Sequence, residues 1–387
     1  YFWGAQVTAS AKVLPYVKTL ASTVTQTFTE TLRVEYDAAT GENLGALIEG
    51  GSTNLAVHSE DFSNATWTKN EISVSQNAIQ APDSTLSADS LAATATSTVG
   101  LNFVDNNTST VGTTYTHSVY AKKGSIDVLQ IFFGNNAVSG NPRVNFDLTN
   151  GVVGTQDAAI INATITSVGG GWYRCACVVT ANTTSTQRYF ALVSSPTSVR
   201  AEARANTAGD NCYIWGAQVE QLPFATSYIR TEGAAVSRSS DGLSIGADNI
   251  SDQDSTFNIN FKVLGANTTF QKIFSHTGNF GYYSLYTPPN GYVIKSTIGE
   301  SSSGSYKTTS ANEHNKITGV YSFLNGTFSG YSENEIVFTN SISNFTKNPA
   351  NRLFIGSATS TTQFTFGHIS KFKTYAQALT AQEITLL

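Results

Sequence analysis

Hydrophobic and polar residues alternate along many short stretches of this chain, and the stretches end at residues that favour turns. The alternation is clear at 115–120, 143–148 and 172–178, and Asn150-Gly151 and Gly169–Gly171 interrupt it. A period of two residues is typical of strands with one buried face, and Asn and Gly permit the tight turns of antiparallel hairpins. The pattern predicts an all-β fold of tandem antiparallel β-sandwich or jelly-roll modules.

The last third of the chain shows the same alternation and ends in a different pattern. We expect strands at 256–263, 292–295, 316–321, 352–355 and 368–372. The final stretch, 379–387, predicts one short C-terminal helix.

Two positions suit the beginning of a helix. Thr380 and Glu383 have the spacing of a capping box, in which a hydroxyl and a carboxylate satisfy free N–H groups of the first turn. A second short helix is expected at 61–67, capped by Ser63 or Asn64.

One strand sequence occurs twice. Tyr1–Val7 reads YFWGAQV and Tyr213–Val219 reads YIWGAQV, and a proline followed by an aromatic residue comes soon after each copy. The repeat predicts two copies of one module, the first represented by its last strand alone. Two explanations stay open: the rest of that copy precedes Tyr1 in a longer chain, or the strand pairs with another subunit.

These patterns divide the chain into five parts. Residues 1–19 are the last strand of a preceding, truncated β-sandwich copy; 20–53 a β connector with a turn at Asp37–Gly41; 54–231 a complete β-sandwich; 232–241 a linker; and 242–387 a jelly roll.

Composition narrows the classes of function. Only 13% of the residues are charged and the net charge is −5, so no basic surface is expected to attract nucleic acid. No apolar run approaches the roughly 20 residues that span a bilayer, so membrane insertion is not expected. The chain contains no methionine and begins with Tyr1, which favours a fragment of a longer protein.

The three cysteines do not form a disulfide framework. Cys175 and Cys177 lie two residues apart on a predicted strand, so their side chains share a face. We interpret them as buried free thiols and not as metal ligands. A disulfide to Cys212 stays open if the strands prove adjacent.

Several segments of the complete sandwich resemble a module that recurs in bacteriophage structural and tail proteins, where it is described as a carbohydrate-binding-like β-sandwich. The resemblance is carried by 54–55, 59–67, 170–174, 213–218 and 226–229, and Arg33–Asp37 with 45–49 is similar to the connector that precedes it.

The C-terminal part resembles the laminin-G-like, concanavalin-type jelly roll at 320–321, 328–331, 353–356, 367–369 and 375–384. Together, the two resemblances imply a non-enzymatic virion surface protein outside the cell: a tail fibre, spike or capsid decoration that attaches to host glycan. They imply other virion proteins and copies of the same chain, in a homotrimer, as partners. The jelly-roll family often binds calcium, but no calcium ligand, and no other cofactor or metal site, is assigned.

No catalytic residues are predicted. Concanavalin-type glycanases carry a Glu-x-Asp-x-x-Glu run on one strand, and this sequence contains no such run. Glycoside cleavage needs acids placed across the bond, whereas Glu333 and Glu335 lie on an expected hairpin without a third acidic partner. The five histidines are scattered without metal-ligand spacing. A Ser-His-Asp triad has no local sequence pattern, so that alternative stays open.

Aromatic residues offer the best candidates for ligand contact. Trp215 of the repeated strand could form a sugar platform, but its place in an alternating strand favours a role in the core. The tyrosine-rich segment next to Pro288-Pro289 is the better candidate, and we predict ligand binding by Tyr282, Tyr283, Tyr286 and Tyr292. Two alternatives remain for the whole chain: a polysaccharide depolymerase and a bacterial extracellular adhesin.

Overall fold

The computed structural model describes most of residues 33–387, and it describes the backbone alone for 99–105, 186, 244–246, 255, 257, 263, 271–355, 374 and 381. The residues outside the description are 1–32, 39, 95–98, 106–108, 185, 203–208, 247–254, 264–270, 277–281, 287–291, 298–307, 310–313, 323–326, 333–334, 342–351, 356–366, 376, 378 and 385–387. The first copy of the repeated strand, and with it the prediction for 1–19, therefore lies outside the described residues.

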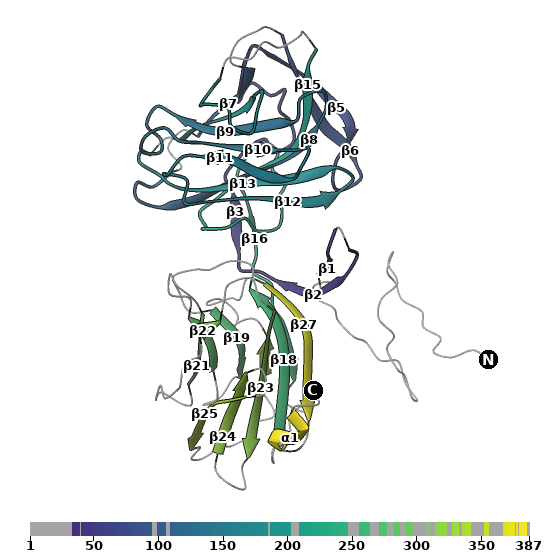
Figure 1. The fold of residues 1–387 in the computed structure, drawn as a ribbon, viewed down its shortest axis with the longest axis vertical. Helices are drawn as coiled ribbons and strands as arrows, with labels where there is room; N and C mark the ends of the chain where they lie inside the picture. The colour runs from purple at the N-terminus through teal and green to yellow at the C-terminus, as the bar shows by residue number, and fades with distance from the viewer. Residues whose placement is uncertain are drawn as a thin grey trace, which may run out of the picture. The chain divides into compact units, whose positions relative to one another are not determined.

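The complete sandwich consists of two antiparallel sheets (Figure 1). The β9 sheet has six described strands in the spatial order β11 (Val152–Gln156), β10 (Arg143–Asp147), β9 (Val128–Gly134), β14 (Thr186–Leu192), β7 (Val99–Asp105) and β4 (Trp67–Asn70). The β8 sheet has six described strands in the order β12 (Asn162–Gly169), β13 (Trp172–Thr180), β8 (Thr114–Lys123), β15 (Asn211–Glu220), β6 (Leu86–Ala93) and β5 (Ile72–Gln80).

One hydrophobic core fills the space between these sheets. Leu129, Ile131 and Phe133 of β9 meet Cys175 and Cys177 of β13 there. Alternate residues of strands such as β9, β10 and β13 enter the core, as the period of two predicted, because successive side chains of a strand point to opposite faces.

The three cysteines are free and buried, which confirms the interpretation as buried free thiols. Burial raises the pKa of Cys177 and of Cys212 to about 12. The alternative of a disulfide to Cys212 is wrong: strand β8 lies between β13 and β15, so Cys212 is not on a strand adjacent to Cys175 and Cys177.

The C-terminal part also consists of two antiparallel sheets. The β18 sheet has the described order β1 (Val34–Tyr36), β2 (Asn43–Ile48), β27 (Gly367–Tyr375), β18 (Ser255–Val263), β23 (His314–Ser322), β24 (Thr327–Ser332) and β25 (Glu335–Ser341). The β19 sheet has the described order β17 (Leu243–Gly246), β26 (Arg352–Ile355), β19 (Gln271–His276), β20 (Tyr282–Tyr286), β21 (Tyr292–Thr297) and β22 (Thr308–Thr309).

The segment expected to be a connector contributes to this C-terminal part. Strand β2 pairs with β27, with Ala46 opposite Ile369, so the β1–β2 hairpin extends the β18 sheet. Next, β3 (Ser52–Asn54) pairs with β16 (Val236–Arg238). The two ends of the sandwich, far apart in sequence, thus run side by side.

The helix predictions had different outcomes. Helix α1 (Ala381–Ile384) is present, and the capping box is confirmed: the Glu383 carboxylate accepts the Thr380 N–H at 2.8 Å, and the Thr380 hydroxyl accepts the Glu383 N–H at 3.3 Å. The helix expected at 61–67 is wrong, since the segment forms turns. The Asp61 carboxylate accepts the N–H of Asn64, and such local bonds compete with helix formation.

The predicted all-β fold with one short C-terminal helix is therefore confirmed for the described residues. None of the described helices has the length and hydropathy needed to cross a membrane.

Candidate functional site

The four predicted ligand-binding tyrosines belong to two neighbouring strands. Tyr282, Tyr283 and Tyr286 lie on β20, and Tyr292 begins β21. The strands pair with Tyr286 opposite Val293, so the backbone of Tyr292 lies one residue from that position. The backbone brings the four positions to one hairpin, whereas the loop with Pro288-Pro289 lies outside the described residues. Ligand contact by these side chains stays a prediction.

A second candidate surface lies on the side of the β9 sheet that faces away from the core. It carries Gln130 and Phe132 from β9, Arg143 and Asn145 from β10, and Tyr189 from β14, each alternating with core residues of its strand. The register aligns them, because Phe132 is opposite both Arg143 and Tyr189, and Gln130 is opposite Asn145.

The loop 193–202 covers one half of this surface and satisfies its buried polar groups. Asn145 Nδ2 donates to the carbonyl oxygen of Ser198 at 2.8 Å, and Gln130 Nε2 donates to that of Val199 at 3.0 Å. The N–H of Ala201 donates back to Gln130 Oε1 at 2.7 Å. These bonds hold the loop on the sheet, since buried polar groups left unpaired are costly.

A cation and two aromatic rings stack at the border of the covered half. The rings of Phe132 and Tyr189 are parallel, with centroids 4.4 Å apart and an interplanar angle of 1°. The Arg200 guanidinium lies 4.7 Å from the Phe132 centroid and donates from Nη2 to the Phe133 carbonyl oxygen at 2.8 Å. Phe132 is buried, Tyr189 is partly buried and Arg200 is exposed.

The open half of the surface continues from Tyr189 toward β4. Tyr189 is opposite Asn102 of β7, which is opposite Thr68 of β4. Thr68 and Asn70 are exposed, whereas Trp67 between the sheets is buried. We call the row from Arg200 and Phe132 through Tyr189 to Thr68 the Tyr189 face. No sequence pattern pointed to it, because its members come from strands far apart in the chain.

The Trp215 side chain packs as predicted. It is 4% exposed and contacts the rings of Tyr120 and Tyr228, with centroids 5.2 Å and 4.4 Å away. Its indole N–H donates to Ser87 Oγ at 3.0 Å. The interpretation as a core residue is confirmed.

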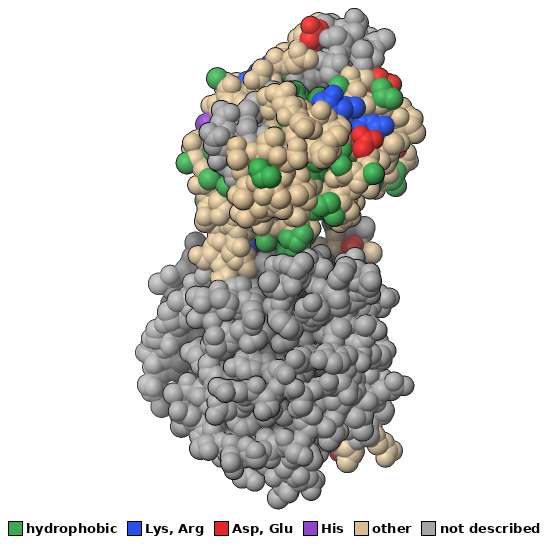
Figure 2. All heavy atoms as spheres, turned by 90° about the vertical axis from the view of Figure 1, so that its left-hand side faces the viewer, with side chains coloured by type: hydrophobic (Ala, Val, Ile, Leu, Met, Phe, Trp, Pro, Cys, Tyr) green, Lys and Arg blue, Asp and Glu red, His purple; other side chains and the backbone are tan. Residues whose placement is uncertain are grey.

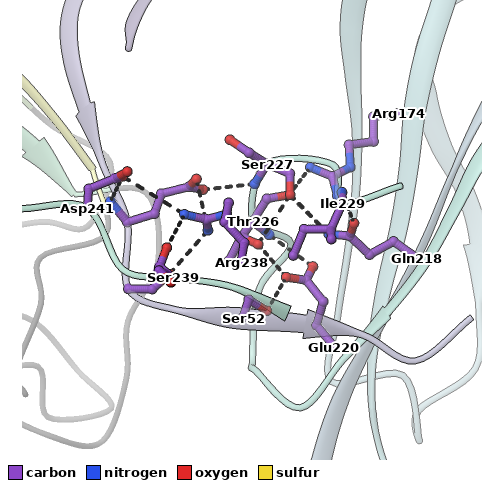
Figure 3. A network of polar contacts seen from close by, with 12 residues as sticks. Ser52, Arg174, Gln218, Glu220, Thr226, Ser227, Ile229, Arg238, Ser239 and Asp241 are labelled. Carbon is purple, nitrogen blue, oxygen red and sulfur yellow. Dashed lines mark hydrogen bonds and ion pairs between the residues drawn. The ribbon is translucent and has the colours of Figure 1, made fainter. Parts of the chain in front are cut away.

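The end of the repeated strand anchors the loop that follows it (Figure 3). Gln218 Oε1 accepts the N–H of Ile229 at 2.7 Å, and its Nε2 donates to the Thr226 carbonyl oxygen at 3.3 Å. The buried Glu220 carboxylate accepts from Ser52 Oγ at 2.7 Å and from the Thr226 N–H at 3.0 Å. These side chains therefore have a structural role in the sandwich.

A group of charges joins the two segments that lead into and out of the sandwich (Figure 3). Arg238 Nη2 lies 3.2 Å from the Glu49 carboxylate, whose other oxygen accepts the Ser227 N–H at 2.9 Å. Asp241 accepts the Glu49 N–H at 2.8 Å. These contacts reinforce the β3–β16 pair.

The buried Asp89 and the partly buried Glu60 have raised pKa values. Burial raises the pKa of Asp89 to about 6, although its carboxylate accepts the N–H groups of Phe62 and Asn77. Burial also raises the pKa of Glu60, against the hydrogen bond from Tyr228. Their backbone and tyrosine partners are those of structural carboxylates. The part of the chain that the structure describes holds no group of three or more His, Cys, Asp or Glu side chains placed to bind a metal.

The C-terminal match is the informative comparison with known proteins. Residues 237–385 match the family Laminin_G_3, described as the concanavalin A-like lectin/glucanases superfamily. The predicted concanavalin-type jelly roll is confirmed. The matched segment begins within β16, and the β1–β2 hairpin that extends its sheet lies outside the match.

Several solved structures overlap with parts of the chain. A mutant of the NanB sialidase from Streptococcus pneumoniae is 17% identical over 38% of this chain and 26% of its own, with a TM-score of 0.31. A sialidase CBM40 from Ruminococcus gnavus, bound to α2,3-sialyllactose, is 14% identical over 38% of this chain and 95% of its own, with a TM-score of 0.30. Domain 4 of an extracellular arabinanase from Geobacillus stearothermophilus, in complex with arabinotriose, is 17% identical over 42% of this chain and 79% of its own, with a TM-score of 0.31.

The chain thus spans about a quarter of the length of the sialidase. No curated protein matches it. Membership of the sandwich in a bacteriophage module family gains no support from these comparisons and stays an expectation.

Proposed function

We propose that this chain is a non-enzymatic surface protein that attaches to glycans through its C-terminal jelly roll. The observation that carries the proposal is the match of residues 237–385 to the concanavalin A-like lectin/glucanases superfamily. The superfamily description names both lectins and glucanases, so the non-enzymatic choice rests on the chain itself. Its sequence has no paired carboxylates at a spacing suited to glycoside cleavage.

The β20–β21 hairpin is the proposed place of contact. Tyrosine suits a sugar, because its ring can stack on apolar C–H groups while its hydroxyl forms hydrogen bonds. The four tyrosine positions lie on two paired strands, where alternation places Tyr282 and Tyr286 on one face of the sheet and Tyr283 and Tyr292 on the other.

The surface chemistry favours recognition of an uncharged ligand. Figure 2 shows one side of the described sandwich, where most of the surface is neither basic nor acidic and the few charged side chains mix both signs. With 13% charged residues and a net charge of −5, a polyanionic partner such as nucleic acid is disfavoured.

We place the protein on the outside of a virion, as a tail fibre, spike or capsid decoration, assembled as a homotrimer with other virion proteins. The recurrence of the strand sequence at Tyr1–Val7 and Tyr213–Val219 supports a modular architecture of the kind that fibres use. A bacterial extracellular adhesin is the alternative that the same features allow. Native mass measurement of the assembly tests the trimer, and density for the chain on purified particles tests its location.

Binding of the whole chain to a glycan microarray tests the adhesive function. We expect binding that Tyr282→Ala with Tyr286→Ala weakens at least tenfold, about 1.4 kcal/mol. The matched control is Tyr36→Ala, which removes a tyrosine that is 61% exposed on the β1–β2 hairpin. No binding to any glycan would leave the protein with a structural role alone.

The enzymatic alternative has its own measurement. Incubation of the chain with host polysaccharide should release no reducing ends. Release that follows protein concentration would make the chain a depolymerase and overturn the non-enzymatic proposal.

A further inference from the structure

We propose that strand β12 forms a weak, two-fold symmetric contact between two copies of this chain. The strand lies at the border of the β8 sheet beside β13 (Figure 1), and none of the described strands pairs with its outer side. An edge strand presents unpaired backbone N–H and C=O groups that can pair with another strand. The contact belongs to the complete sandwich, so it is independent of the jelly roll and of any ligand bound there.

Strand β12 lacks the features by which edge strands avoid pairing with other chains. Its sequence, NATITSVG, contains no charged residue and no proline. It pairs one to one with β13 from Asn162 to Ser167, and its register shifts only after Ser167. Charged side chains, proline, bulges and short length are the usual protection of an edge. Strand β12 is therefore open to a partner strand.

The other three borders of the described sandwich carry such protection. Strand β5 has two shifts in its register against β6, and Asn77 within it has a φ of +52°. Strand β4 is 4 residues long and contains Lys69. Strand β11 is 5 residues long, and its register against β10 shifts between Val144 and Phe146. Among the described strands of the sandwich, β12 is thus the long, regular and uncharged border.

Apolar side chains are left partly uncovered along the flank that includes β12. Ile165 of β12 is partly buried and packs against the edge of the core. Ile161, just before the strand, is 59% exposed. The sequence 157–169 contains one charged residue, Asp157, which pairs with Arg143 at 2.5 Å. A strand added at β12 would cover these apolar groups without leaving a charge unpaired.

The sequence of β12 fits an antiparallel copy of itself. Opposite residues of antiparallel strands share a face of the sheet, so a two-fold axis perpendicular to the sheet passes through a residue position. An axis at Ile165 pairs the longest part of the strand. Ile165 then lies opposite Ile165 of the second copy and Thr164 opposite Thr166, and no like charges meet. A second copy always brings the matching edge, because a two-fold interface uses the same patch on both chains.

The size of the flank predicts that this contact is weak. The strand has 8 residues. At about 3.3 Å each they span roughly 26 Å, and two sheets packed about 10 Å apart give a flank of roughly 260 Å². This is about a third of the ~800 Å² that each partner buries in a stable interface. We therefore expect a dissociation constant above about 10 μM.

Sedimentation equilibrium of the whole chain from about 1 to about 500 μM tests the contact. We expect the mean mass to double with concentration: from one chain to two or, if the homotrimer of the proposed function forms, from three chains to six. Thr164→Lys brings like charges onto the two paired strands and should weaken the doubling at least tenfold. The matched control is Thr68→Lys, which adds the same charge to an exposed position of β4 and should leave the doubling unchanged.

Thermal unfolding of both lysine variants shows whether the sandwich is intact. A mass that stays constant over the whole concentration range would overturn the proposal. A doubling that survives in Thr164→Lys would overturn it as well, because the copies would then meet at another surface.

Introduced cysteines test the register of the two strands. An axis at Ile165 predicts that a mixture of Thr164→Cys and Thr166→Cys chains forms disulfide-linked heterodimers on mild oxidation. Either variant alone should cross-link less, since its two cysteines are diagonal neighbours. The three native cysteines are buried and do not compete. A yield in the mixture no higher than in the separate variants would overturn the two-fold pairing at Ile165.

Discussion

At the scale of single residues, the sandwich core contains a histidine that must stay neutral. The His117 ring packs 5.1 Å from that of Phe133, and its Nδ1 lies 3.3 Å from Arg188 Nη1. Burial and then the positive charge of Arg188 hold the pKa of His117 well below its ordinary value. Alternation predicted a strand through this residue, but only the paired sheets show that a cation lies across the core from it.

We predict that His117 makes the protein less stable in mild acid. The unfolded chain takes up a proton near pH 6.5 and the folded chain does not, so its contribution is complete above that pH and is lost as the pH falls. The loss is about 1.4 kcal/mol per pH unit below 6.5. Urea unfolding at pH 7.5 and 5.5 should show this drop in the wild type and a smaller one in His117→Gln. Equal drops in both would contradict the burial of a neutral ring.

Asp89 gives the stability of the protein a pH dependence opposite to that of His117. Its folded pKa of about 6 lies above the ordinary value of 3.8, so the folded state keeps a proton that the unfolded state releases. The associated stability is complete below about pH 3.8 and is lost as the pH rises through 6, by at most about 3 kcal/mol.

The comparison of wild type with Asp89→Asn isolates this effect. We expect the wild type to lose stability relative to the variant between pH 4 and pH 7, as measured by urea unfolding. A constant difference over that range would show that Asp89 is ionised throughout. The two hydrogen bonds that Asp89 accepts from backbone N–H groups would then lower its pKa by more than burial raises it.

At the scale of elements, the repeated strand depends on an irregularity at Gly216. The pairing of β15 with β8 shifts between Trp215 and Gln218, and Gly216 has a φ of +62° at this bulge. A Cβ at Gly216 would lie 2.9 Å from the Tyr120 ring. The glycine of the WGAQ sequence is therefore required by both backbone conformation and packing.

Gly216→Ala should destabilise the sandwich by about 1–3 kcal/mol, because it adds a clash to the cost of a positive φ. Gly140→Ala is the matched control: its φ is +78°, and nothing lies within 4 Å of its added Cβ. Thermal unfolding should show a larger decrease in Tm for Gly216→Ala. Similar decreases would mean that Tyr120 moves aside at no cost.

The elements show where sequence reasoning succeeds and where it ends. Alternation located strands such as β10 and β13, because burial of one face depends on local pattern. The Tyr189 face was missed, since it needs the register between β9 and β14 and the loop 193–202, none of which a local pattern encodes. The helix at 61–67 failed for a local reason: Asp61 bonds its own backbone neighbours.

At the scale of the whole chain, the C-terminal β18 sheet is built from two distant segments. The β1–β2 hairpin precedes the sandwich in sequence yet pairs with β27, and Glu35 Oε2 lies 2.6 Å from Nε2 of the buried His368. Ala46, Leu47 and Ile48 are buried by this pairing. The sandwich is therefore inserted in sequence between two parts of one sheet, and that sheet of the lectin/glucanase-like domain includes residues outside the family match.

Two glycines of the hairpin test whether that sheet depends on it. Gly45 has a φ of +99°, and a Cβ there would lie 2.5 Å from Ser370 Cα and against the Ile369 carbonyl oxygen; Gly41 has a φ of +72° and open space around it. Gly45→Ala should push β2 away from β27, whereas Gly41→Ala strains the turn alone. We expect hydrogen exchange of 367–375 to increase several-fold in Gly45→Ala and to stay unchanged in Gly41→Ala, with exchange in β8 and β9 unaffected in both. Local opening exposes the amides of a strand that loses its neighbour. Unchanged exchange of β27 in Gly45→Ala would therefore mean that β18 alone holds β27 in the sheet. The hairpin would then add nothing to the stability of β27.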